Sequence, residues 1–234
     1  MAKFVDYITK ASGAFWSNFF SFFGAMLLLV LVLAVLIVVA SFAMAANYGL
    51  GLILVLLAIA AAAVIRASIY GMAAEALKKG KTSIGTLFST FREKWATLLG
   101  IEIASAVIIA LPLLLLLLVA GGLPTSSSYA PAFTGSVSII VILCIVVLAV
   151  IIAVLILLAI PAAVCDGTGV IQSLKASFGV AKSHFASLFA MYVTFTIIGG
   201  VLGLIPVVGT IAVLLLIEPL ATVAFTEFYL KSKA

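Results

Sequence analysis

Six long apolar stretches occupy most of the chain, and each is long enough to cross a lipid bilayer. About 20 apolar residues span a hydrocarbon core of about 30 Å, at a helical rise of 1.5 Å per residue. Only 8% of the residues are charged, whereas soluble domains carry about 25%. The composition therefore excludes a water-soluble globular domain. The predicted spans are Ala25–Ala46, Leu50–Met72, Ala96–Ala120, Val137–Ala163, Ser187–Ile205 and Val207–Tyr229.

The spans are expected to be helices. In lipid the backbone must satisfy its own hydrogen bonds, so only α-helices or closed β-barrels cross a membrane. Strands of a barrel alternate apolar and polar residues, whereas these stretches are continuously apolar. We therefore predict an all-α, polytopic six-helix transmembrane bundle that forms a single integral membrane domain over residues 1–234.

The basic residues lie in alternate connections. Lysines precede the first span and follow the sixth, and two further basic loops separate spans 2 and 3 and spans 4 and 5. The connections at 47–49, at 121–136 and around Pro206 carry no charge. The positive-inside rule then predicts a plasma-membrane protein with both termini and both basic loops in the cytoplasm. This placement indicates topology and interfacial contact rather than nucleic-acid binding. The basic residues of the two cytoplasmic loops are Lys78, Lys79, Lys81, Arg92, Lys94, Lys175 and Lys182.

A segment with a helical apolar stripe precedes each odd-numbered span. In Ile8–Phe22, Ile84–Trp95 and Ile171–Phe185 the apolar residues recur at steps of three and four, which is the spacing of one helix face. An aromatic-rich stripe beside lysine and arginine is typical of a helix that lies in the membrane interface. We expect three cytoplasmic interfacial amphipathic helices.

The second and third of these segments also match in sequence. Their positions differ by 90 residues, as in Phe88 with Phe178, and Leu98 with Leu188. This pattern suggests a threefold repeat of an amphipathic helix and a two-span hairpin, with units 1–75, 76–166 and 167–234. The alternative is that any interfacial helix before a span has a similar composition.

Three ionisable residues, Arg66, Glu102 and Glu218, lie within predicted spans. Each costs roughly 2.5–3.5 kcal/mol at a helix centre on insertion scales. Arg66 precedes Glu75 by nine residues and Glu218 precedes Glu227 by nine, which places both about 13 Å from a common interface. We expect Arg66 to pair with one of the two glutamates. The pair is either an ion or proton site or a structural lock between spans 2, 3 and 6.

Prolines are expected to break three spans, because each removes a backbone donor. They are Pro112, Pro161 and Pro219. Discontinuous helices form substrate sites in transporters, although kinks without a function are commoner. The sequence holds no convincing catalytic motif and no cofactor motif. Its single histidine is His184, and a metal site needs several converging ligands.

Two segments near the C-terminal end carry a resemblance to a known group. They are Asp-Gly-x-Gly-Val-x-x-Ser-Leu-x-x-Ser from Asp166, and Pro206-Val-Val-Gly leading to Glu218-Pro219-Leu220. They resemble a broad group of uncharacterised six-span prokaryotic membrane proteins, related to the membrane domain of some glycerophosphodiester phosphodiesterases. The resemblance implies a six-helix fold with cytoplasmic interfacial helices. It implies no phosphodiesterase activity, because the chain shows no such catalytic domain.

These observations predict a non-enzymatic multi-pass membrane protein that organises anionic lipid of the cytoplasmic leaflet or scaffolds a membrane protein partner. The alternative is a small-solute or ion transporter or channel with its site at Arg66, Glu102 and Glu218. A third hypothesis, a lipid-modifying enzyme, would have only Glu75, Asp166 and His184 as chemical groups. A water-accessible cavity that reaches Glu218 would favour transport, whereas a dry packed ion pair would favour the first interpretation.

Overall fold

The computed structural model describes residues 2–119 and 139–233, and within these ranges it is all-helical. Six helical stretches are long and apolar enough to cross a membrane, which confirms the six predicted spans. The predicted connection 121–136 lies outside the described residues. The helices are α1 (Ala2–Ser17), α2 (Phe19–Ala46), α3 (Tyr48–Lys79), α4 (Ile84–Val119), α5 (Ile139–Ile156), α6 (Ala159–Asp166), α7 (Val170–Ser183), α8 (Phe185–Gly203), α9 (Val208–Ala212), the π-helix η1 (Val213–Ile217) and α10 (Glu218–Lys233).

Several helices run past the predicted limits of the spans. The prediction ends the second span at Met72, but α3 continues to Lys79 and stops only where Gly80 adopts a left-handed φ of 78°. Gly167, with a φ of 69°, ends α6 in the same way. Glycine accepts this conformation without the steric cost of a side chain. Apolar runs mark the lipid-embedded core of a helix, whereas backbone conformation marks its end.

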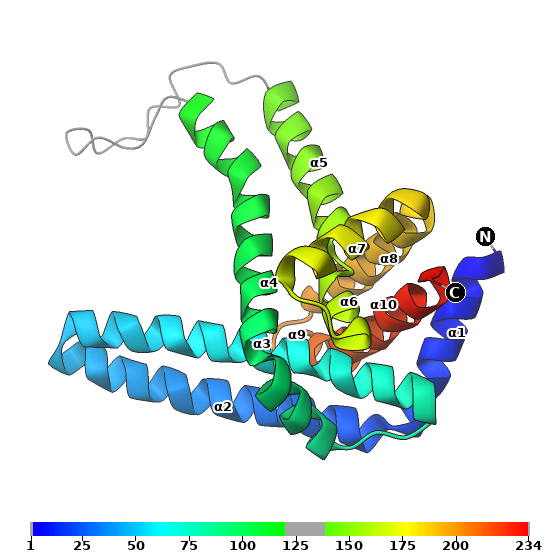
Figure 1. Ribbon diagram of the computed structural model, residues 1–234. Helices are drawn as coiled ribbons and strands as arrows, with labels where there is room; N and C mark the ends of the chain where they lie inside the picture. The colour runs from blue at the N-terminus through cyan, green and yellow to red at the C-terminus, as the bar shows by residue number, and fades with distance from the viewer. Residues whose placement is uncertain (1, 120–138, 234) are drawn as a thin grey trace.

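The first two spans form a hairpin that points away from the C-terminal end of α4 and the N-terminal end of α5 (Figure 1). The side chain of Asn47 caps α3, because its Oδ1 accepts the N–H of Leu50 at 3.1 Å. At Gly51 a Cβ would lie 2.1 Å from Met44 Cγ, so glycine allows the two helices to approach closely there. The pair α2 and α3 and the pair α4 and α5 diverge outward from the middle of the molecule (Figure 1).

The three amphipathic segments do not share one structure. Two are separate helices, α1 and α7, which end before Asn18 and His184. The middle segment is instead continuous with its span in α4. Asn and His are weak helix formers, whereas the corresponding stretch of α4 from Arg92 to Leu98 is made mostly of residues that favour a helix. The middle segment is therefore the first part of a longer helix, and the prediction of three interfacial amphipathic helices is not confirmed.

The apolar stripes of these segments also face different surroundings. In the first, Ala11, Phe15 and Phe22 are buried in the protein. In the other two, Phe88 and Phe178 are exposed, although Leu87 and Ala181 of the same stripes are buried. Placement of these segments in a membrane interface stays a prediction, and so does the threefold repeat.

The core gathers around α10. Every residue from Thr222 to Tyr229 is buried, and α1 packs alongside this helix (Figure 1). Lys10 Nζ lies 3.0 Å from Glu227 Oε1, and the rings of Tyr7 and Phe228 are 5.1 Å apart. The first and last helices of the described chain are therefore joined.

Candidate functional site

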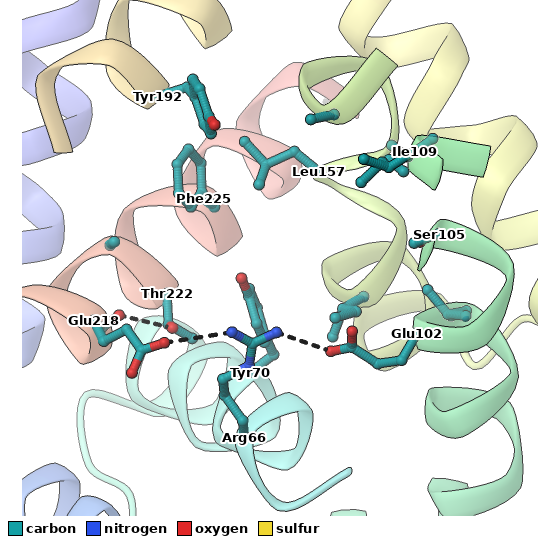
Figure 2. Close-up of a pocket in the computed structure, with 15 residues that line it drawn as sticks. Arg66, Tyr70, Glu102, Ser105, Ile109, Leu157, Tyr192, Glu218, Thr222 and Phe225 are labelled. Carbon is teal, nitrogen blue, oxygen red and sulfur yellow. Dashed lines mark hydrogen bonds and ion pairs between the residues drawn. The ribbon is translucent and has the colours of Figure 1, made fainter. Parts of the chain in front are cut away.

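The side chain of Arg66 lies between two glutamates from other helices. Its Nη2 is 3.3 Å from Glu102 Oε1 on α4, and its Nη1 is 3.5 Å from Glu218 Oε1 on α10. Figure 2 shows the guanidinium reaching from α3 into the space between the two carboxylates. The structure thus brings all three intramembrane charges together, with Arg66 contacting both acids rather than one.

A local irregularity of the last span positions Glu218. Pro219 follows it and has no N–H to donate to the carbonyl four residues earlier. The chain accommodates this with the π-helix η1, and the N–H of Glu218 donates to the carbonyl of Val213. The hydroxyl of Thr222 then donates to the carbonyl of Glu218 at 2.9 Å. π-Helical turns are rare and often occur at functional sites.

The charged side chains line a cavity of about 300 Å³. This volume corresponds to about ten water molecules at about 30 Å³ each. The cavity is not sealed by packing, because half of the Arg66 side chain and about a third of the Glu218 side chain remain exposed (50% and 32%). Other polar side chains around it are Tyr70, Ser105, Tyr192 and Thr222, and apolar ones include Ile109, Leu157 and Phe225.

Each of the two ion pairs is long and is made through one carboxylate oxygen only. Each carboxylate uses one oxygen, at 3.3 and 3.5 Å, whereas a bidentate arginine–carboxylate pair makes two bonds of about 2.7–2.9 Å. One guanidinium faces two carboxylates, so the ionised group carries one surplus negative charge. The geometry therefore leaves carboxylate oxygens available to a further cation.

The three predicted proline breaks have different outcomes. Pro112 lies inside α4, which continues through it. Pro161 follows the interruption between α5 and α6, and Pro219 follows η1. The helix is thus not interrupted at Pro112, and a kink there stays a prediction. A proline interrupts a helix only where the surrounding structure re-satisfies the freed backbone groups.

The hydroxyl of Ser177 supports the interruption at Pro161. It donates to the carbonyl of Leu155 at 2.8 Å and accepts the N–H of Leu158 at 3.1 Å. Ser177 lies on α7 and is fully buried. The adjoining residue Leu157 lines the cavity, so this support shapes the wall of the site.

The predicted basic residues of the cytoplasmic loops are spread over the surface. Lys79 pairs with Glu75 at 2.9 Å. Lys94 is partly buried, and its Nζ donates to the carbonyls of Ala163 and Val164 at the end of α6. A cation at a helix C-terminus is favourable. The ammonium of Lys94 therefore caps the C-terminal end of α6. Besides Lys79, the exposed residues are Lys78, Lys81, Arg92, Lys175 and Lys182.

Several polar residues of the site were missed by the sequence analysis. Tyr70 follows Arg66 by four residues, and Thr222 follows Glu218 by four. A spacing of four places a side chain on the same helix face, so this signal was present. Tyr192 lies on α8, and no neighbouring residue in the sequence indicates that it belongs to the site. Among the described residues, no group of three or more histidine, cysteine or acidic side chains could hold a metal.

A comparison with known proteins matches the chain to one family. Residues 9–234 match DUF7847, a domain of unknown function. No curated protein and no solved structure matches the chain. The link to glycerophosphodiester phosphodiesterases stays a prediction, since the family match carries no such relationship. Because the match covers nearly the whole sequence, the chain belongs to the DUF7847 family.

Proposed function

We propose that the protein is a non-enzymatic transporter or channel for a small cation or a proton, with its site at Arg66, Glu102 and Glu218. The observation that carries the proposal is the cavity of about 300 Å³ that reaches all three charged side chains. In a protein that only organises lipid or holds a partner, we expect tightly packed side chains to fill the space around these charges and exclude water. The half-exposed side chain of Arg66 argues against that arrangement.

The charge of the site favours a cation over an anion. Each intramembrane charge costs roughly 2.5–3.5 kcal/mol on insertion scales. Arg66 can offset one carboxylate but not both. A proton or a small cation would neutralise the remaining carboxylate, whereas an anion would add to the surplus negative charge. The cavity volume limits the solute to about the size of ten water molecules.

The interrupted helices beside the site supply elements that can move. Glu218 directly follows η1, and Leu157 lies in the interruption between α5 and α6. Half-helices next to a binding site are common in secondary transporters. We place the protein in the plasma membrane with both termini in the cytoplasm, on the basis of the loop charges.

The test is charge movement in vesicles that contain the purified protein. Solid-supported membrane electrophysiology would record currents after concentration jumps of H⁺, Na⁺, K⁺ or methylammonium. We expect a current for at least one of these cations. Glu218→Gln should abolish it, because the substitution removes the surplus negative charge. The matched control is Glu93→Gln, an exposed acid on α4 away from the cavity, which should keep the current.

Two results would overturn the proposal. One is a current that Glu218→Gln leaves at the wild-type level, and the other is the absence of a current for all four cations. The structural-lock hypothesis makes a separate prediction about stability. A lock requires Glu218→Gln to lower the unfolding midpoint clearly. The proposed transport site instead requires the unfolding midpoint of Glu218→Gln to stay close to that of the wild type, because the remaining pair of Arg66 and Glu102 is neutral.

A charge swap tests the geometry of the pairing itself. Exchanging Arg66→Glu and Glu218→Arg restores a simple two-residue pair. In this structure it also places the new carboxylate at 66 beside Glu102. We therefore expect the double variant to recover only part of the stability lost in Arg66→Glu. Full recovery would show that Glu102 does not contribute to the site.

A further inference from the structure

A second cavity, of about 390 Å³, lies on the outer face of α4, α5 and α7. We call it the lipid groove. Its walls carry a single charged residue, Lys175. The apolar residues of its walls are Ile108, Ile152, Leu155, Ile156, Leu174 and Phe178.

On α7 both apolar and polar residues are exposed, whereas two hydroxyl residues are buried. The hydroxyl residues Ser173 and Ser177 are fully buried against the protein, whereas Ile171 and Phe178 are 69% and 50% exposed. A helix on a water-facing surface buries its apolar side. The exposed apolar side chains of Ile171 and Phe178 therefore fit surroundings that are themselves apolar, which for a six-span protein means lipid chains.

Lys175 is a free cation at the edge of this apolar surface. It is exposed, and no carboxylate among the described residues lies within ion-pair distance of it. By contrast, Lys10, Lys79 and Lys233 each have an acidic partner. A cation against apolar surroundings requires a counter-charge or water. The long lysine side chain can carry its ammonium to a headgroup while its stem covers apolar surface.

We propose that the lipid groove binds an anionic phospholipid, with one acyl chain along the apolar walls and the headgroup phosphate on Lys175. A lipid joins an anion and an apolar chain within one molecule, and these are the two features that the groove offers. A water-soluble solute would leave the walls unmatched, and a zwitterionic lipid brings no net charge to Lys175. The proposal is independent of cation transport at Arg66. Ile156 lines both cavities, so a bound chain would contact a wall of the ion site.

The experiment is native mass spectrometry of the full chain with phosphatidylglycerol or phosphatidylcholine of identical acyl chains. We expect phosphatidylglycerol to be retained in preference. Lys175→Gln should lower its occupancy about fivefold, the effect of one nearby cation, and should leave phosphatidylcholine unchanged. The matched control is Lys182→Gln, an exposed lysine on the same helix but outside the groove, which should bind lipid as the wild type does. Inorganic phosphate at the same concentration should not displace the lipid.

A second variant tests the acyl-chain part of the site. Ile152→Trp fills the groove with an apolar ring and should reduce binding of both lipids, with unchanged helical circular dichroism. Equal losses in the Lys175 and Lys182 variants would overturn the proposal, because they would indicate general surface attraction. So would displacement of the lipid by inorganic phosphate, equal retention of the two lipids, or unaltered binding to Ile152→Trp.

Discussion

Replacing Ser177 by alanine should destabilise the protein more than its conservative chemistry suggests. The hydroxyl is fully buried and serves two backbone groups at once. It donates to the carbonyl of Leu155 and accepts the N–H of Leu158, where α5 gives way to α6. Alanine removes both contacts, and it leaves a space where no water from the surface can replace them.

The size of the effect follows from these two contacts. A buried polar group left without a partner costs about 1–3 kcal/mol in soluble proteins. Hydrogen bonds between membrane helices average only about 0.6 kcal/mol, because the unfolded chain in lipid also finds partners. Two contacts closer to the membrane value than to the soluble one predict a loss of about 1–3 kcal/mol in the free energy of unfolding.

The measurement is unfolding by sodium dodecyl sulfate in mixed micelles, followed by far-ultraviolet circular dichroism. Ser183→Ala is the matched control, because Ser183 lies on the same helix, is exposed and contacts only the carbonyl of Gly179. We expect that control to unfold at the wild-type midpoint and Ser177→Ala to unfold at a clearly lower one. Identical midpoints for the two variants would refute the assignment of Ser177 as the support of the interruption.

Three further substitutions test contacts between distant helices. Tyr229→Phe removes a 2.6 Å bond to Asp166 and should cost about 1.5–3 kcal/mol; an unchanged midpoint in the same unfolding assay would contradict this. Gly71→Leu should drive α3 away from α4, because even a Cβ would lie 2.1 Å from Thr90 Oγ1. We expect early elution on size exclusion, with partial rescue by Thr90→Ala, and normal elution of the single variant would count against the crossing. Lys94→Met keeps the apolar stem but loses the carbonyl contacts at the end of α6. It should cost about 0.3–1 kcal/mol, read as a small shift of the unfolding midpoint, and a gain in stability would speak against the cap.

The sequence was sufficient for the six spans, whereas the depth of the charges in a membrane stays a prediction. Apolar length alone identifies six helices, because lipid leaves the backbone no other way to satisfy its hydrogen bonds. The equal nine-residue spacings to Glu75 and Glu227 placed Arg66 and Glu218 at one level. Spacing along a helix predicts the depth of a side chain in the membrane, but it does not predict which neighbouring helix the side chain faces. It therefore did not reveal that Arg66 would contact Glu102 as well.

Other features depend on contacts that no local pattern records. Pro112 and Pro161 look alike in the sequence, yet only Pro161 lies beside a helix interruption, where Ser177 from another helix supplies hydrogen bonds. The stripe of α1 resembles that of α7, but Phe15 is buried and Phe178 is exposed. The difference arises because α10 covers α1, which is a matter of tertiary packing.

The joining of α1 to α10 has a consequence for biogenesis. Chains are synthesised from the N-terminal end, so the partner of Lys10 leaves the ribosome more than two hundred residues later. Until then the buried face of α1, which includes Ala11 and Phe15, lacks its final neighbour. The early hairpin can insert on its own, but the bundle closes only when the last helix arrives. Quality control in the cell would therefore have a simple mark of an unfinished molecule, namely an N-terminal helix that is still uncovered.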